Sequence, residues 1–173
     1  MNAHRRQVTP VRAVARGIVA GLVGTAVMDT LLFARYRRRG GADGPYEWES
    51  SAGVTDWEQA PAPAHVGKRL VEGLFGVQLQ PSRARLVNNA MHWGYGALNG
   101  AVYGVIAESL PRRRVGYGLP FGAAVWAGDY VILPAAGLYK PIWEYDAKTL
   151  ADDLSGHLVF GLATAATLRL LSP

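Results

Sequence analysis

The stretch NNAMHWGYGALNG, residues 88–100, decides how the fold is interpreted, because two asparagines and a histidine open an otherwise apolar segment. A second stretch, DDLSGHLVFGLATA at residues 152–165, repeats the order histidine, two residues, aromatic, glycine. When the two stretches are aligned, His92 falls on His157. The repetition predicts two related helices that carry polar groups at the same level.

Composition favours a membrane protein of the all-α class. Half of the 173 residues are hydrophobic and 18% are charged, whereas soluble domains average about 25% charged residues. Four apolar segments approach the ~20 residues that cross a bilayer as a helix. Open strands are excluded because lipid offers the backbone no hydrogen bonds. The alternative is a soluble bundle, but soluble helices are seldom this long and uniformly apolar. We expect one transmembrane domain, 1–173, an integral membrane four-helix bundle with helices at about 13–35, 86–110, 115–138 and 150–171 and a long outer loop at 36–85.

The first segment begins like a signal peptide, with Arg5 and Arg6 before an apolar run. Asp29 interrupts that run and ARYRRR ends it, so we expect a retained helix. Four crossings place both termini on one side. The basic N-terminus and the LPRRRVG turn favour the cytoplasm for that side, although the arginines of residues 35–39 count against it.

Polar residues of the four predicted helices fall within roughly 10 Å of one membrane face when counted at about 1.5 Å per residue. Such groups normally face the bundle interior and a partner. Asp29 and Asp129 are natural partners for the two histidines. The predicted polar layer consists of Asp29, Asn88, Asn89, His92, Asp129, Asp153 and His157.

Three interpretations of this layer remain open. Paired carboxylates and imidazoles suit a proton relay or a pH-sensitive switch. The same donor types suit Zn, Fe or Mn. A purely structural hydrogen-bonded cluster is the third interpretation, in which Asp152, Asp153 and Asn88 act as helix caps. We expect no bound metal and no cofactor.

Glycines spaced by four predict close helix contacts, because small residues let backbones approach in lipid. These contacts join helices of one chain or two copies in a homo-oligomer. Together with the histidine repeat, they predict two parallel helical-hairpin repeats whose Asp/His sets face each other. The glycines are Gly17 and Gly21, then Gly96, Gly100 and Gly104, then Gly118 and Gly122.

The outer segments carry Trp48, Trp57 and Trp143, each followed by glutamate. Tryptophans are common anchors at the membrane interface, and a lid or partner surface over the polar layer is the alternative role. After the stretch APAPA, a stripe of aliphatic side chains predicts an amphipathic helix on the bilayer surface. That stripe consists of Val66, Leu70, Leu74 and Val77.

From residue 86 to residue 169 the chain resembles the YagU-like inner-membrane proteins of bacteria. The resemblance rests on the His92 helix ending in AESLP, the segment ending at Pro134, PIWEY, and SGHLVFG before Arg169. It implies a location in the bacterial inner (plasma) membrane and a link to acid resistance. The first long loop departs from the pattern of that family.

No nucleophile elbow, His-Glu-x-x-His or phosphate-binding glycine loop occurs, so we expect a protein that is not an enzyme. The net charge of +5 suits anionic lipid rather than nucleic acid. Two function classes remain. The first is a small membrane protein that senses or moves protons, or a small solute, through the polar layer. The second is a structural or accessory subunit that binds a membrane protein partner through its Trp-rich loops.

Overall fold

The computed structural model describes residues 9–110 and 114–171, and all regular structure in these ranges is helical, which confirms the all-α prediction. Arg5, Arg6, Arg112 and Arg113, which were used to assign orientation, lie outside the described residues. The α-helices are α1 (Pro10–Arg38), α2 (Pro45–Glu49), α3 (Ala62–Phe75), α4 (Ala84–Ser109), α5 (Gly118–Ala135) and α6 (Ala147–Leu171), and the 3₁₀ turns are η1 (Pro81–Arg83), η2 (Val115–Tyr117) and η3 (Ile142–Glu144).

The helix expected at 115–138 is shorter than predicted, because it begins with a 3₁₀ turn and ends at Ala135. Pro134 occupies its last turn, and Gly137 follows with a φ of 67°. A glycine in the left-handed region is a common end for a helix. The predicted outer loop at 36–85 also holds more structure than expected, since α1 extends to Arg38 and both α2 and α3 lie within it.

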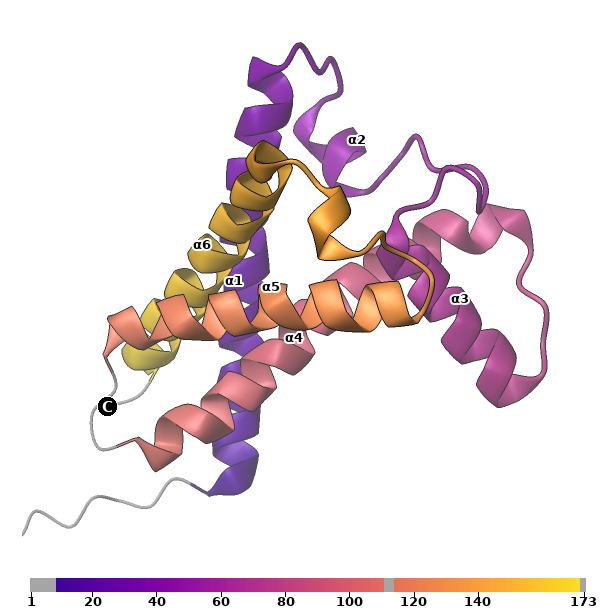
Figure 1. The fold of residues 1–173 in the computed structure, drawn as a ribbon. Coiled ribbons are helices and arrows are strands. Elements are labelled where there is room, and N and C mark those ends of the chain that lie inside the picture. The colour runs from indigo at the N-terminus through magenta and orange to yellow at the C-terminus, as the bar shows by residue number, and fades with distance from the viewer. Residues whose placement is uncertain (1–8, 111–113, 172–173) are drawn as a thin grey trace, which may run out of the picture.

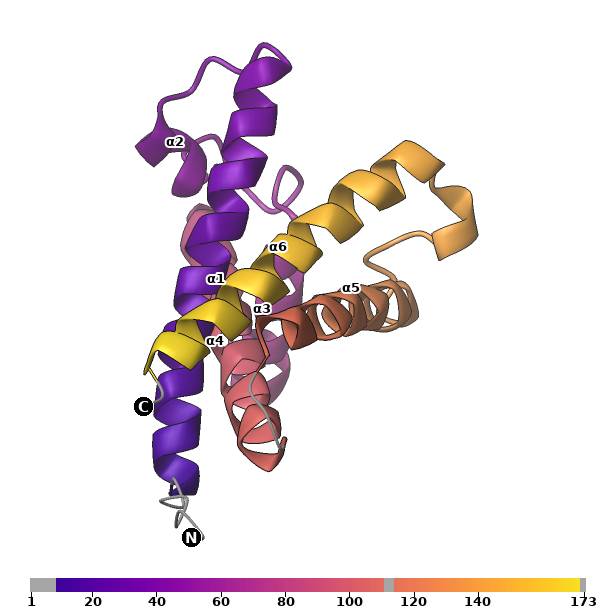
Figure 2. The same cartoon turned by 90° about the vertical axis from the view of Figure 1, so that its left-hand side faces the viewer.

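The four long helices alternate in direction and pack side by side in the order α4, α1, α6, α5. In Figure 1, the end of α1, the start of α4, the end of α5 and the start of α6 lie toward the side that carries α2 and α3. Figure 2 shows α5 steeply inclined to α1 from a second direction. The helices therefore splay, with α5 inclined away from α1.

Glycines form the closest helix contacts. A Cβ at Gly100 would lie 2.6 Å from the backbone nitrogen of Gly21, so α1 and α4 touch backbone to backbone. In the second hairpin, a Cβ at Gly161 would lie 2.8 Å from the nitrogen of Gly122. The predicted glycine contacts therefore join helices within this chain.

The two hairpins repeat these contacts, but they are not related by the facing symmetry that was expected. Symmetric repeats would give α1 and α5 equivalent positions. Instead α1 packs between α4 and α6, whereas α5 packs on α6 at the end of the row. The helix contacts therefore lack the expected symmetry, and α4 and α5 meet through long side chains such as Tyr103 and Phe121, whose rings are 4.7 Å apart. The expectation that the histidines face a shared interior agrees with the structure, since His92 and His157 line the same cavity.

Two of the described helices, α1 and α6, are long and apolar enough to cross a membrane. Only 33% of the apolar window in each is buried within the molecule, unlike the core helix of a soluble protein. Helices α4 and α5 do not meet the same criteria of length and hydropathy, so the expected four membrane crossings are not confirmed. Exposed apolar surface on α1 and α6 favours membrane association.

The amphipathic helix is present as α3, although Val77 lies beyond its end. Its small residues Ala64 and Gly67 are buried, and the side chain of Met91 in α4 packs against Gly67. Leu70 and Leu74 of the aliphatic stripe face outward and are 49% and 75% exposed, whereas Val66 is half-buried. This outward stripe leaves α3 an apolar surface free to contact lipid.

Candidate functional site

A cavity of about 300 Å³ lies between α4 and α5, with α1 and α6 behind it. Its wall is mostly apolar, and Val66 of α3 lines it as well. The rings of Phe121 and Phe160, whose centroids are 6.2 Å apart, pack beside it. The polar side chains that line it are Thr25, His92, Tyr95, Asn99, Asp129, Asp153, His157 and Tyr139.

The first Asp–His pair joins α1 to α4. Nε2 of His92 lies 2.9 and 3.1 Å from the two carboxylate oxygens of Asp29. Asp29 is 4% exposed, so this carboxylate is held in the interior. Glu49, at the end of α2, brings a second carboxylate to the pair, and one ligand atom from each of the three residues lies within 4.8 Å of the others.

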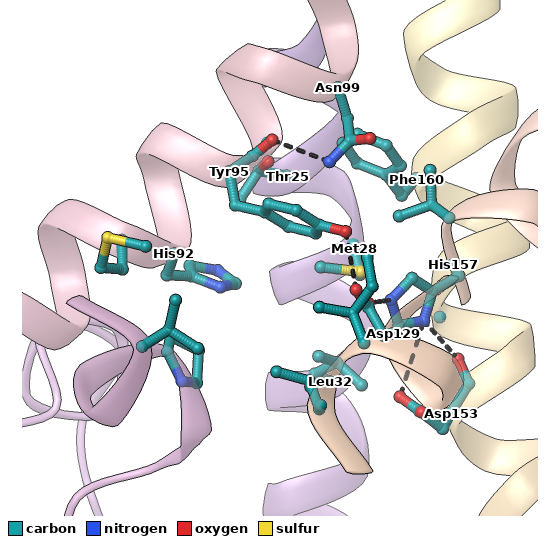
Figure 3. A pocket seen from close by; sticks show the side chains of 18 of the residues that line it. Thr25, Met28, Leu32, His92, Tyr95, Asn99, Asp129, Asp153, His157 and Phe160 are labelled. Atoms are coloured by element: carbon teal, nitrogen blue, oxygen red, sulfur yellow. Dashed lines mark hydrogen bonds and ion pairs between the residues drawn. The ribbon is translucent and has the colours of Figure 1, made fainter. Parts of the chain in front are cut away.

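The second Asp–His pair joins α5 to α6 and extends to α4, as Figure 3 shows. Nε2 of His157 lies 3.3 Å from Oδ2 of Asp129, and the hydroxyl of Tyr95 donates to Oδ1 of Asp129 over 2.6 Å. Nδ1 of His157 donates to the backbone oxygen of Asp153 at 3.0 Å and lies 3.6 Å from its carboxylate. The imidazole therefore has a carboxylate on each side of its ring.

The tautomer of His157 follows from these contacts. A carbonyl oxygen only accepts, so Nδ1 must carry a proton. A carboxylate oxygen also accepts. The contact between Nε2 and Asp129 therefore either holds a second proton, shared by the two groups, or holds no proton. Asp129 and His157 both line the cavity, so this contact lies at its wall.

A second, open hollow borders the first cavity. It is lined by Arg35, Arg39 and Lys148, and it shares Tyr139 and Asp153 with the inner cavity. Asp153 therefore stands between an open basic surface and His157. The second histidine pair has one side toward this hollow and the other toward the inner cavity.

Asn88 and Asn89 do not point at the histidines. Nδ2 of Asn88 donates to Oγ of Ser51 at 2.9 Å, and Nδ2 of Asn89 donates to the backbone oxygen of Ser50 at 2.9 Å. Arg85 binds the same Ser50 oxygen at 2.8 Å. These residues hold the turn that follows α2, and that turn positions Glu49.

The capping role considered for Asp152, Asp153 and Asn88 is wrong. Helix α6 begins at Ala147, and the carboxylate that caps it belongs to Asp146, whose Oδ1 accepts from the backbone nitrogen of Thr149 at 2.9 Å. Asp152 pairs instead with Arg39 and Lys148 on the surface. Asn88 lies in the second turn of α4.

The three tryptophans differ in environment. Trp48 packs on Phe33 of α1, with ring centroids 5.5 Å apart. The indole nitrogen of Trp57 donates to the backbone oxygen of Leu79 at 3.3 Å. Trp143 is 81% exposed. An anchoring role suits Trp143, whereas the other two tryptophans hold the outer segments in place.

Glu49 and Tyr95 belong to the site but were missed from the sequence. Glu49 was visible as the acid of a Trp-Glu pair, and its contact with Asp29 depends on the path of the α1–α2 connection. Tyr95 lies one turn after His92 and was aligned with Phe160 as an aromatic. Its hydroxyl has a role only because α5 brings Asp129 within reach.

Two groups of the outer segments, Glu49 and Tyr139, have raised pKa values. Burial, followed by the charge of Asp29, raises the pKa of Glu49 above its ordinary value of 4.5. Burial, followed by the charges of Asp153 and Asp129, raises the pKa of Tyr139 to about 12. In both groups, burial and nearby negative charge disfavour the ionised form.

A family profile described as "Protein of unknown function (DUF1440)" matches residues 76–166. The matched region runs from the end of α3 into α6 and includes both histidine pairs except Asp29. Glu49 also lies outside it. No curated protein and no solved structure matches the chain.

Proposed function

Because the chain belongs to the family of proteins of unknown function designated DUF1440, we propose a function from the geometry of its own residues. The protein is a multi-pass membrane protein that relays protons, and responds to them, through the second Asp–His pair. The observation that carries this proposal is the position of His157, which lies between Asp153 at the open hollow and Asp129 at the inner cavity.

The relay has a defined order. Asp153 lies at the open hollow, His157 follows, and Asp129 receives the hydroxyl of Tyr95 at the inner cavity. Because Nδ1 already carries a proton, His157 would accept a proton at Nε2 from the Asp129 side and release the Nδ1 proton toward the Asp153 carboxylate. Histidine titrates near pH 6.5 in water, so the relay operates in the range of mild acid stress.

Charged and titratable groups approach the relay from every packed helix. Helix α1 contributes Arg35, which donates to Oγ of Ser155 at 2.9 Å, and α4 contributes His92 and Tyr95 across the cavity. Helix α5 contributes Asp129, and the segment after it contributes Tyr139. A proton on His157 is therefore balanced mainly by Asp129 and Asp153.

Four membrane crossings complete the proposal. The four long helices alternate in direction, and the Asp–His groups all lie within about 15 Å of the helix ends on one side. Helices α1 and α6 are long and apolar enough to cross a membrane, and α4 and α5, which pack on them, would provide the other two crossings. The relay then lies near one membrane face, with both termini on the cytoplasmic side of a bacterial inner membrane.

The resemblance to YagU-like proteins supports a role in acid resistance, since a proton relay with a histidine at its centre responds in that pH range. Within this proposal the protein is not an enzyme, because the paired groups exchange protons without a bond of a substrate being made or broken. Its partners are the lipid bilayer and, as a second copy, a homo-oligomer.

An accessory role is the second candidate function. The observation that favours it is the exposure of apolar side chains on the outer segments, where Trp143 is 81% and Phe75 is 72% exposed. Exposed aromatic residues of this kind suit either a membrane protein partner or the lipid interface. Loss of a partner on Trp143→Ala, with proton flux retained, would favour this role.

Proton flux tests the relay. The full chain is reconstituted in liposomes that enclose a pH-sensitive dye, and a pH gradient is applied. We expect His157→Gln and Asp129→Asn each to lower the flux about tenfold or more, because both substitutions remove a titrating group and keep hydrogen-bonding shape. His65→Gln, a histidine of α3 that does not line the cavity, is the matched control.

Folding is checked in each variant by circular dichroism and by thermal unfolding in detergent. If the relay variants fold normally and conduct protons like the wild type, the proposal is wrong. If they unfold readily while the protein that remains folded conducts normally, the polar layer is structural, because a half-satisfied cluster in hydrocarbon is costly.

A further inference from the structure

The cluster of Asp29, Glu49 and His92 has no part in the relay described above. Its three side chains come from α1, α2 and α4, which are far apart in the sequence. One oxygen of each carboxylate and one imidazole nitrogen lie within 4.8 Å of one another. Three donors from three elements therefore converge on one point.

The charges of this cluster do not balance. Two carboxylates face one imidazole, which supplies at most one positive charge. Asp29 is 4% exposed, so solvent does little to offset its charge. Oε1 of Glu49 is buried, and no donor of residues 9–110 or 114–171 is hydrogen-bonded to it. Buried charges are normally paired or coordinate a metal, so a cation bound at this point would balance the second carboxylate.

The spacing of the donors fits a small divalent metal. Ligand atoms about 2.0–2.2 Å from a tetrahedral zinc lie roughly 3.3 Å from one another. Nε2 of His92 lies 2.9 Å from Oδ2 of Asp29, so a shift of a few tenths of an ångström between these atoms admits the ion. Glu49 is on a five-residue helix, which can adjust more easily than the packed α1 and α4.

The second histidine pair provides a contrast within the same molecule. It also has two carboxylates, but Asp129 lies at Nε2 of His157 and Asp153 lies toward Nδ1. The two nitrogens of an imidazole ring point in different directions, so one ion cannot reach both carboxylates and the ring. The arrangement at His157 suits proton transfer, whereas the arrangement at His92 suits metal binding.

We propose that Asp29, Glu49 and His92 form a binding site for a divalent first-row transition metal, with zinc or manganese as the best fit. Imidazole disfavours magnesium and calcium, and carboxylates disfavour copper(I). Three protein ligands leave a coordination position open, as in sites that bind an exchangeable water or solute. His92 lines the inner cavity, so bound metal lies at its edge. This site revises the expectation of no metal.

Side chains of α4 hold the segment that carries Glu49. Arg85 and Asn89 bind the backbone oxygen of Ser50, and Asn88 binds Oγ of Ser51. These contacts fix the residue that follows Glu49 in the sequence. The asparagine pair that opens α4 therefore positions a ligand of the metal.

Calorimetric titration of the metal-free full chain in detergent tests the site, with zinc, manganese and magnesium salts as separate probes. We expect one equivalent of zinc or manganese to bind, and magnesium to bind at least tenfold more weakly. Glu49→Gln and His92→Gln should each weaken binding of the transition metal about tenfold or more. Glu47→Gln, an exposed acid on the same short helix, is the control.

A spectroscopic probe keeps the test independent of folding defects. Cobalt(II) bound by nitrogen and oxygen ligands absorbs visible light, and we expect this absorption in the wild type and in His157→Gln, but not in His92→Gln. The site is refuted if zinc and manganese do not bind, or if their binding is unchanged in Glu49→Gln and His92→Gln. Normal metal binding in a protein that conducts no protons would refute the relay alone.

Discussion

The same residue pair, aspartate with histidine, occurs twice in this chain in two chemical settings. At His92 both neighbouring carboxylates approach one region beside the ring, which concentrates negative charge. At His157 they approach opposite nitrogens, which defines a direction for a proton. The difference arises from the second carboxylate at each histidine. At His92 it is Glu49, which comes from an outer helix, and at His157 it is Asp153, which comes from the preceding turn of α6.

Asp146 offers a prediction about pH at the scale of one residue. Hydrogen bonds from the side chain and the backbone of Thr149 lower the pKa of Asp146 below its ordinary value of 3.8. A lowered pKa means that the ionised cap stabilises the folded state above pH 3.8 and that this contribution is lost as the pH falls through the lowered value. We expect Asp146→Asn to keep the cap and lose this pH dependence.

The measurement is thermal unfolding of both proteins from pH 6 to pH 2. The wild type should have the higher melting temperature at pH 6, and the difference should shrink toward pH 2. Glu47→Gln, in a residue that caps no long helix, should leave the pH profile unchanged. A difference between wild type and Asp146→Asn that stays constant to pH 2 would contradict this account.

At the scale of helices, glycine decides which faces of α1 and α4 meet. Gly100 contacts the backbone of Gly21, whereas Gly94 on the same helix has no atom within 4 Å of its would-be Cβ. We expect Gly100→Ala to destabilise the fold by about 1–3 kcal/mol, because overpacking separates the helices. Gly94→Ala should be neutral or stabilise by up to about 1 kcal/mol, because alanine favours the helix.

Denaturant unfolding in mixed detergent micelles measures both free energies. The two substitutions are matched in chemistry and in helix, so their difference reports the helix contact rather than the propensity. Equal effects of Gly100→Ala and Gly94→Ala would show that α1 and α4 do not meet at this face.

The short helix α2 illustrates a second principle at this scale. Five residues are too few for a stable isolated helix, and the position of α2 depends on contacts with α1 and α4. The packing of Trp48 on Phe33 and the hydrogen bonds from Arg85 to Ser50 provide them. Trp48, which the sequence suggested as a membrane anchor, therefore positions the carboxylate of Glu49.

At the scale of the whole molecule, alternating helix directions place α2, α3 and η3 on one side, and the end of α4 and the start of α5 on the other (Figure 1). Four crossings then predict that Ser51 and Trp143 share one side of the membrane. Ala3, Arg113 and Ser172, which lie outside the described residues, share the other. The chain has no cysteine, so single-cysteine variants can be labelled without background.

A membrane-impermeant thiol reagent applied to intact spheroplasts distinguishes the two sides. We expect labelling at Ser51→Cys and Trp143→Cys, and protection at Ala3→Cys, Arg113→Cys and Ser172→Cys until the membrane is permeabilised. Labelling of Ser51→Cys and Ser172→Cys from the same side would contradict four crossings. If Ala3→Cys, Arg113→Cys and Ser172→Cys are labelled while Ser51→Cys and Trp143→Cys are protected, the protein has four crossings in the opposite orientation.

Local patterns in the sequence were sufficient to predict the helices and the Asp–His partners. Hydrophobic length marks the long helices, glycine spacing marks their contacts, and the histidine repeat marks equivalent turns of α4 and α6. These features are periodic along one segment, so they can be recognised without knowing what lies opposite. The all-α class follows from them, as does the pairing of Asp29 with His92.

Tertiary structure alone decided what each pair faces. The order α4, α1, α6, α5 breaks the expected symmetry, and the splay of α5 leaves a cavity beside His157. The path of the outer segment brings Glu49 to Asp29, and the approach of α5 brings Asp129 to Tyr95. These contacts join residues that are distant in the chain, and no periodic pattern specifies them. Their geometry depends on helix inclination and on connections whose conformation is determined by packing.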